Sequence, residues 1–504
     1  MHAYCPPTDC KALAMIEVSA LRPGLGRILP RALAGILSIA VLTLPALAFA
    51  MEGETAGLPH LDGRELGPLW VVPFAGVLLS IAILPLLAPS IWHHHFGKIS
   101  AAWGLAFLIP FAIRYGVPHA TYEVLHVALL EYIPFIVLLT ALFTVAGGVR
   151  LKGALVGTPV MNTAGLAVGT ALASLMGTTG ASMLLIRPLL RANAHRKYKV
   201  HTIVFFIFLV ANIGGSLTPL GDPPLFLGFL KGVDFFWPTT HLFLPMAFCA
   251  VILLTLYFAL DMALSRREPE AVPKLDGGAE PIGLEGKANL VLLVAIVGAV
   301  LLSGVWKPGI ELTVWTVHVP LESVGSQLLL VLITVLSLKL TSEQSRRLNG
   351  FTWGPMVEVA KLFAAIFLTI IPAIAILKAG TEGALAPIVA SVNQGGQPVP
   401  AAYFWATGVL SSFLDNAPTY LIFFNTAGGD ARHLMTDLAL TLGAISAGAV
   451  FMGANTYIGN APNFMVKAIA EERGVKMPSF FGYMLWSCGI LVPLFGLVTV
   501  VFFR

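Results

Sequence analysis

One stretch, residues 210–225, constrains the fold more than any other part of the sequence. It reads Val-Ala-Asn-Ile-Gly-Gly-Ser-Leu-Thr-Pro-Leu-Gly-Asp-Pro-Pro-Leu and lies inside a long apolar run. Proline removes a backbone donor and glycine loosens a helix, so we expect no straight helix here. In hydrocarbon, such a break persists only inside protein or beside a wet cavity. A carboxylate at that depth is a candidate functional group, which makes Asp222 the first residue to consider.

The rest of the sequence has the composition of a membrane protein. Of its 504 residues, 57% are hydrophobic and only 11% are charged, whereas a soluble domain carries about 25% charged residues. We therefore predict an all-α polytopic membrane protein whose main partner is the lipid bilayer. The net charge of +4 is no sign of a nucleic-acid partner, because membrane proteins concentrate Lys and Arg in cytoplasmic loops.

The N-terminus has the pattern of a secretory signal peptide. Arg22, Arg27 and Arg31 precede an apolar run that ends in Ala48-Phe49-Ala50, which is a basic region, a short apolar region and an A-x-A cleavage pattern. We predict a signal peptide over residues 1–50 and a short extracytoplasmic segment over residues 51–66. An uncleaved first membrane helix is the alternative. The expected location is the bacterial inner (plasma) membrane.

Apolar runs of about 20 residues mark the membrane spans. A half at residues 67–264 and a half at residues 288–504 flank a cytoplasmic linker at residues 265–287, which is rich in charge, Pro and Gly. Basic residues flank both ends of residues 159–190, which requires an even number of crossings or a re-entrant hairpin. The polar, glycine-bearing turn at residues 176–182 favours the hairpin. Each half then has three spans, a hairpin with a polar tip, a broken span and a plain span. Ten spans are predicted at residues 66–89, 101–115, 124–149, 202–230, 241–264, 288–306, 324–340, 353–377, 435–466 and 480–503, with hairpins at 159–190 and 401–425.

The order and directions of these elements predict an inverted repeat. With the signal peptide removed, the first half starts outside and the second starts inside, so each element has a partner of opposite direction. The second broken span carries Gly-Ala-Asn-Thr-Tyr-Ile-Gly-Asn-Ala-Pro-Asn at residues 453–463. Inverted repeats with paired discontinuous elements are typical of secondary transporters, whose substrate site lies at the repeat interface.

Two hairpin tips and two broken spans are expected to surround one site near the middle of the membrane. Carbonyl, hydroxyl and amide oxygens there can replace the hydration shell of a small cation. Asp222 and Asp415 add two carboxylates that can bind either a proton or Na⁺, so we expect Na⁺ at Asp222 and Asp415. Glu131, deep in the third predicted span, is a candidate proton relay. The other candidate ion or substrate ligands are Asn212, Thr218, Asn416, Thr419, Asn455, Asn460, Thr178, Thr179 and Ser182.

These residues also have plainer interpretations. Asp222 and Asp415 each precede a proline near a helix start, so either could cap a half-helix, which would not exclude ion binding. Thr178, Thr179 and Ser182 could be small residues that let helices approach one another.

The motifs resemble those of a known group of transporters. Asn-Ile-Gly-Gly-Ser-Leu-Thr-Pro-Leu-Gly-Asp-Pro-Pro resembles the broken-helix motif of the ion transporter superfamily. The nearest pattern within it is the NhaD-type sodium/proton antiporter and citrate transporter branch, with Leu-Asp-Asn-Ala-Pro-Thr as the matching hairpin. The resemblance covers residues 67–503, and it implies a homodimer in which the hairpin-bearing domain moves like an elevator. The hairpin tips lack the Ser-Asn-Thr pattern that is typical of dicarboxylate carriers.

The resulting hypothesis is a secondary active transporter that exchanges Na⁺ or Li⁺ for H⁺ by alternating access. Adjacent carboxylates would repel an anionic substrate, which favours a cation over an organic anion. A cation-coupled citrate or other carboxylate transporter of the same superfamily is the alternative. We expect no enzymatic activity, because the sequence carries no recognisable nucleophile or metal set, and no cofactor other than the transported or coupling ions.

Overall fold

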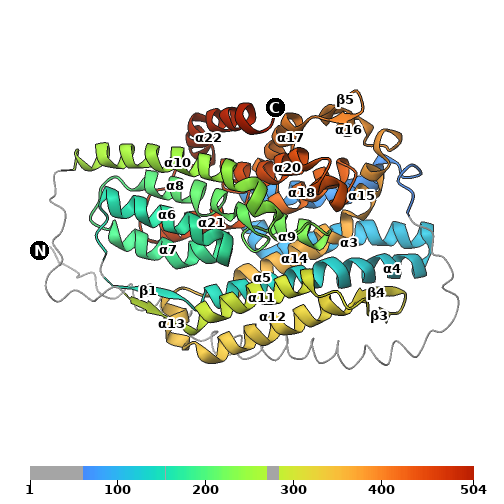
Figure 1. Ribbon diagram of the computed structural model, residues 1–504, viewed down its shortest axis with the longest axis horizontal. Helices are drawn as coiled ribbons and strands as arrows, with labels where there is room; N and C mark the ends of the chain where they lie inside the picture. The colour runs from blue at the N-terminus through green and yellow to red at the C-terminus, as the bar shows by residue number, and fades with distance from the viewer. Residues whose placement is uncertain (1–60, 154, 269–282) are drawn as a thin grey trace, which may run out of the picture. The chain divides into compact units, whose positions relative to one another are not determined.

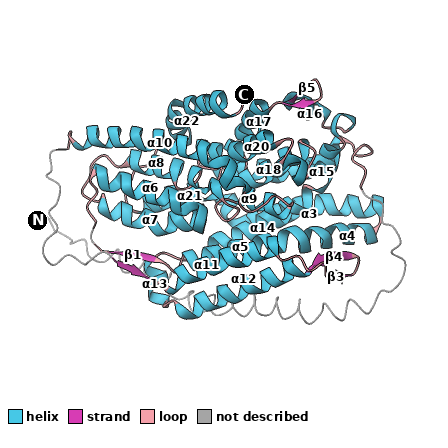
Figure 2. Cartoon of the chain, in the orientation of Figure 1, coloured by secondary structure: helices cyan, strands magenta, loops and turns pink. Residues whose placement is uncertain are grey.

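The computed structural model describes residues 61–153, 155–268 and 283–504, and most of them are helical (Figure 1) (Figure 2). The chain divides into two compact units, of which the larger comprises Pro59–Ile310 and Pro320–Arg504. The described part of the smaller unit, residues 311–319, carries strands β3 (Glu311–Val314) and β4 (Val317–Pro320). The predicted signal peptide over residues 1–50 lies outside the described residues, as does most of the predicted segments 51–66 and 265–287.

The first half of the chain runs from η1 to α10. Its elements are η1 (Pro68–Val71), α2 (Val72–Leu87), α3 (Pro89–Tyr115), α4 (Val117–Val127), η2 (Ala128–Tyr132), α5 (Ile133–Ala146), β1 (Arg150–Lys152), α6 (Pro159–Met176), α7 (Thr178–Ala192), α8 (Val200–Leu209), η3 (Ile213–Leu217), α9 (Pro223–Leu230) and α10 (Trp237–Ser265).

The second half runs from β2 to α22, and β2 pairs antiparallel with β1. Its helices are α11 (Ala288–Val305), α12 (Leu321–Leu340), α13 (Glu343–Leu348), α14 (Gly354–Thr369), α15 (Ile371–Lys378), η4 (Gly380–Glu382), α16 (Ala386–Val392), α17 (Pro400–Phe413), α18 (Asn416–Thr426), α19 (Ala431–Met435), α20 (Ala439–Met452), η5 (Gly453–Asn455), α21 (Ala461–Glu472) and α22 (Phe480–Phe502). Its strands in the larger unit are β2 (Gly283–Glu285), β5 (Asn393–Gln394) and β6 (Gln397–Pro398).

The described helices confirm the prediction of an all-α polytopic membrane protein. Nine of them are long and apolar enough to cross a membrane, or ten if the pair α14 and α15, bent by 42°, counts as one span. One of the nine is α6, the first arm of the first predicted hairpin. The apolar part of the second broken span is shorter, at Ala439–Asn455.

Two predicted helix starts differ from the structure. The second span was expected from residue 101, but α3 begins at Pro89 and includes three exposed histidines at residues 93–95. Proline suits the first turn of a helix, so the helix extends beyond its apolar part. The third span was expected from residue 124, but it begins at Val117 and continues to Ala146 through the π-helical turn η2.

The first broken span lies deep inside the larger unit. Over Val200–Leu217 in the first broken span, 89% of the residues are buried. In the apolar part of the peripheral span Leu321–Leu340, only 17% are buried. Helices α6 and α7 lie side by side (Figure 1). The broken span of each half also contacts the hairpin of the other half. In the first broken span α9 packs against α18 of the second hairpin, and in the second broken span α21 packs against α7 of the first hairpin. This crossed packing brings the polar segments of both halves together.

Candidate functional site

The first broken span stops being an α-helix after α8, at the residues that the sequence singles out. A short 3-10 turn, η3, follows Asn212, and the chain is extended at Thr218 before α9 begins. The backbone approaches itself closely here, since a Cβ on Gly221 would lie 2.1 Å from the carbonyl oxygen of Gly215. The sequence therefore needs glycine at this point to bring Asp222 into position.

Asp222 occupies the N-cap position of α9 but makes no capping hydrogen bond with its side chain. The capping interpretation is therefore wrong for Asp222. The residue is 1% exposed, and its carboxylate accepts hydrogen bonds from Thr178 Oγ1 at 3.1 Å, Asn460 Nδ2 at 3.0 Å and Asn416 Nδ2. These donors come from α7, from the second broken span and from α18. All three are neutral.

Asp415 has the role that Asp222 lacks. Its Oδ1 accepts a hydrogen bond from the backbone nitrogen of Ala417 at 3.1 Å, so it caps α18. Thr419 donates to the backbone oxygen of Asp415 at 3.0 Å, within the same helix. The structure thus gives Asp415 and Thr419 local helix contacts, while Asp222 is held by three separate elements.

Asn460 and Asn212 connect the two broken spans. Asn460 Nδ2 lies 3.3 Å from Asn212 Oδ1, and Asn212 Nδ2 donates to Asn463 Oδ1 at 2.7 Å. Thr218 donates to the backbone oxygen of Ser174 in the first hairpin. Sequence reasoning missed Asn463 and Ser174 as members of this network, although Asn463 closes the motif at residues 453–463.

The remaining predicted residues lie at varying places around this network. Thr179 lines the cavity beside Asp222, while Asn455 donates to Ser412 Oγ at 2.9 Å. Ser182 is fully buried, and its hydroxyl has no hydrogen-bond partner among the described residues. Glu131 is neither among the hydrogen-bond partners of Asp222 nor among the residues that line the cavity, and Lys231 Nζ lies 2.6 Å from its Oε1. Its role as a relay stays a prediction.

A cavity of about 110 Å³ lies beside Asp222. Asp415, Thr178, Thr179 and Asn460 also line it, and most of the other walls are apolar. No lysine, arginine or histidine is among the described residues that line this cavity. Space beside a buried carboxylate can hold water or a small ion, so the chemistry of this site suits the binding of a cation or a proton.

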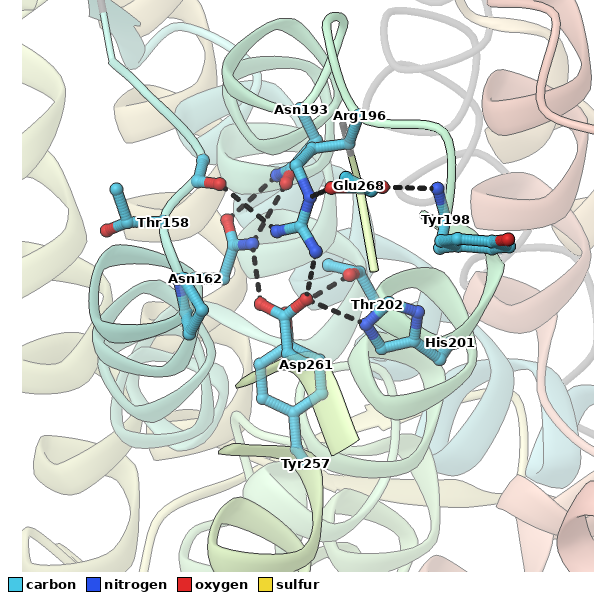
Figure 3. Close-up of polar contacts among 12 residues, drawn as sticks. Thr158, Asn162, Asn193, Arg196, Tyr198, His201, Thr202, Tyr257, Asp261 and Glu268 are labelled. Carbon is cyan, nitrogen blue, oxygen red and sulfur yellow. Dashed lines mark hydrogen bonds and ion pairs between the residues drawn. The ribbon is translucent and has the colours of Figure 1, made fainter. Parts of the chain in front are cut away.

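A second buried aspartate, Asp261 near the end of α10, was missed by the sequence reasoning (Figure 3). Arg196 Nη2 lies 2.8 Å from its Oδ1, and His201 Nε2 lies 2.9 Å from the same atom. Asn162 and Tyr257 donate to Oδ2 at 3.0 and 3.2 Å. Arg196 also pairs with Glu268. We call Asp261, Arg196, His201, Asn162, Tyr257 and Glu268 the clasp.

The clasp connects the ends of the first hairpin to its neighbours. Asn162 lies in the first turn of α6, Arg196 follows α7, His201 is the second residue of α8 and Asp261 lies in α10. Burial alone would lower the pKa of Arg196, but the hydrogen bonds and charges of Asp261 and Glu268 raise it above its ordinary value. Arg196 therefore stays charged beside Asp261 and Glu268.

The sequence matches the model of one family, described as "Putative citrate transport", over residues 63–503. The match includes both hairpins, both broken spans and the clasp. No curated protein matches the chain.

Proposed function

The chain belongs to this citrate transport family, and from that premise we propose that it exchanges Na⁺ or Li⁺ for H⁺ at Asp222 by alternating access. Membership of the family makes the protein a multi-pass secondary transporter of the citrate and ion transporter kind, and points to a transporter rather than an enzyme. The proposal adds the ion, the exchange and the residue that carries it.

The observation that carries the proposal is the set of neighbours of Asp222. The carboxylate is buried and hydrogen-bonded by Thr178, Asn416 and Asn460, none of which carries a charge. A buried charge without a partner of opposite charge is unfavourable, so either a proton or a cation must neutralise it. One carboxylate that binds each in turn is the minimum requirement for exchange.

In this proposal Asp415 belongs to the same ion path. It lines the cavity beside Asp222 and adds negative charge that attracts cations. In the same proposal the protein functions as a homodimer in the bacterial inner membrane, with Na⁺ and H⁺ as the transported or coupling ions.

A cation-coupled citrate carrier is the second candidate, and the description of the family favours it. A tricarboxylate in the cavity would meet Asp222 and Asp415, with no basic side chain among the described residues of the lining. The negative charges of the tricarboxylate and of the two aspartates would repel one another. For this reason we place citrate second.

Everted membrane vesicles separate the two candidates. Addition of Na⁺ or Li⁺ should dissipate an imposed pH gradient, and Asp222→Asn should remove this response, while Asp437→Asn, at an exposed residue, should keep it. Citrate-dependent uptake without any response of the pH gradient to Na⁺ or Li⁺ would contradict exchange and support the carboxylate carrier.

A further inference from the structure

The two broken spans repeat the same contacts at a constant separation. Ser174 Oγ donates to the backbone oxygen of Gly214, and Ser412 Oγ donates to that of Met452. Both residues of the second pair follow those of the first by 238 positions (174 to 412, and 214 to 452). The bond between two distant residues therefore recurs with both partners shifted equally.

The following residues continue the correspondence. The backbone nitrogen of Leu220 donates to Thr218 Oγ1 at 3.2 Å, and that of Ile458 donates to Thr456 Oγ1 at 3.2 Å. The separation is again 238 positions (218 to 456, and 220 to 458). The two breaks are thus equivalent in geometry as well as in composition.

Asp222 and Asn460 are equivalent positions in these two breaks (222 to 460). Their backbone dihedral angles are nearly the same, with φ −143° and ψ 142° at Asp222 and φ −154° and ψ 140° at Asn460. Each is the residue before a half-helix, α9 or α21, that has proline within its first two positions.

The residues that donate hydrogen bonds to Asp222 are related by the same separation of 238 positions. Thr178 and Asn416 are separated by 238 positions, as are Asp222 and Asn460, so the four residues form a set that the repeat maps onto itself. All three members other than Asp222 donate to its carboxylate. The centre of the site is therefore shared by both halves, and one of its two equivalent N-cap positions carries the charge.

The amide nitrogen of Asn460 lies among oxygen atoms. Its distances are 3.0 Å to Asp222 Oδ1, 3.2 Å to the backbone oxygen of Ala211 and 3.3 Å to Asn212 Oδ1. A carboxylate, an amide oxygen and a backbone carbonyl are the ligands that hard cations take. In addition, Asn416 Oδ1 is buried without a hydrogen-bond partner among the described residues, and such an acceptor calls for an explanation.

We infer that Asn460 is the second cation-binding position of the site, equivalent to Asp222, and that a monovalent cation takes the place of its amide nitrogen. This inference rests on the proposed function, because it names further ligands of the same ion. When the cation enters, the Asn460 amide turns and presents its oxygen, and Asn212 Oδ1 and the Ala211 carbonyl complete the shell. Asp415, which caps α18, is not one of these cation ligands.

Na⁺ binding to the purified full-length protein tests the inference. Asn460→Asp should tighten binding by at least about tenfold, because ligand charge sets cation affinity. Asp222→Asn should abolish binding, and the exchanged pair Asp222→Asn with Asn460→Asp should restore it. Asn393→Asp is the control, since it adds a carboxylate at a half-buried asparagine of β5, outside the site, and it should leave the affinity unchanged.

Suppose that the wild type binds Na⁺ normally but the exchanged pair binds it as weakly as Asp222→Asn does. That result overturns the inference and leaves the proposed function standing. Absence of Na⁺ binding by the wild type overturns both. If Asn460→Asp does not fold, Asn460→Ser, which keeps an oxygen, should bind Na⁺ at least about tenfold more tightly than Asn460→Val, which has no polar atom. Equal binding by these two variants also overturns the inference.

Discussion

Two buried aspartates in the first half of the chain differ in what surrounds them. Asp261 is 0% exposed and pairs with Arg196 and His201 (Figure 3), whereas Asp222 is 1% exposed and accepts hydrogen bonds from three neutral side chains. Burial is therefore the same in both places, and the difference lies in the charge of the neighbours.

This difference assigns a structural role to one carboxylate and leaves the other available for chemistry. An ion pair that is complete within the protein needs no further partner, and removing one of its members leaves the other buried and uncompensated. Neutral donors orient a carboxylate without cancelling its charge, so a mobile proton or cation can still neutralise it. The contrast predicts that the clasp governs stability and Asp222 governs transport.

The largest expected effect on stability comes from breaking the clasp. Asp261→Ala removes the buried carboxylate that Arg196, His201 and Asn162 share, and it leaves Glu268 as the remaining carboxylate beside Arg196. We expect a loss of about 3–5 kcal/mol in the free energy of unfolding. Thermal unfolding of the purified protein measures it. Asp437→Ala, which breaks an exposed pair with His433, is the control and should cost at most about 1 kcal/mol. Equal stability of the two variants would remove the structural role of the clasp.

Glu131 tests whether a carboxylate that is paired with a cation can also serve transport. Glu131→Gln weakens the bond from Lys231, and a hydrogen bond to a charged group contributes about 1.5–3 kcal/mol, so the unfolding midpoint should fall moderately. If Glu131 also relays protons, exchange becomes slower while the Na⁺ concentration for half-maximal rate stays the same. Exchange at the wild-type rate would limit Glu131 to an ion pair.

The glycines at the two breaks test whether both halves constrain the site equally. A Cβ on Gly221 would lie 2.1 Å from the Gly215 carbonyl oxygen, and one on Gly459 would lie 2.6 Å from the Gly453 carbonyl oxygen. Because backbone must shift in both cases, each substitution by Ala should cost about 1–3 kcal/mol of stability, with the greater loss of stability and of exchange at Gly221.

Gly165 in α6 is the matched control for these substitutions, because nothing lies within 4 Å of its added Cβ. Gly165→Ala should leave the unfolding midpoint unchanged or raise it, since Ala is the better helix former. If Gly221→Ala behaves like Gly165→Ala, the close approach at the first break does not constrain the site.

The smallest expected effect is at the ion pair between β1 and β2. A hydrogen bond from Arg150, opposed by slight burial, holds the pKa of Glu285 below its ordinary value. The stabilisation is therefore complete above the unfolded pKa of about 4.3 and is lost as the pH falls through the lower folded value. Its size should be under about 1 kcal/mol, because the pair is partly exposed. Glu285→Gln should remove this dependence from thermal unfolding measured against pH, and an unchanged dependence would assign it to other groups.

Local sequence signals were enough to predict the breaks and the hairpins. Glycine and proline inside apolar runs have direct effects on the backbone, so the irregular turn before Asp222 and the hairpin turn at Gly177, with φ +80°, could be placed from the sequence. The all-α polytopic fold followed from the length and spacing of the apolar runs. Helix starts such as that of α3 were less certain because polar residues can extend a helix beyond its apolar part.

The partners of the buried carboxylates could not be predicted in the same way. Asp261 meets Arg196 and Asn162, which lie 65 and 99 positions away, and only tertiary packing brings them together. The same limitation explains why Asp222 and Asp415 were treated as an equivalent pair. Both have the sequence of a helix start, but only the fold shows that Asp415 caps α18 while Asp222 faces Asn460 from the other half.

Proton release on addition of Na⁺ tests the central claim most directly. In a weakly buffered solution of the purified protein, Na⁺ that displaces a proton from Asp222 should acidify the solution. We predict this acidification for the wild type and for Asp437→Asn, and none for Asp222→Asn. A wild-type protein that binds Na⁺ without releasing protons, or that releases as many protons after Asp222→Asn, would contradict exchange at Asp222.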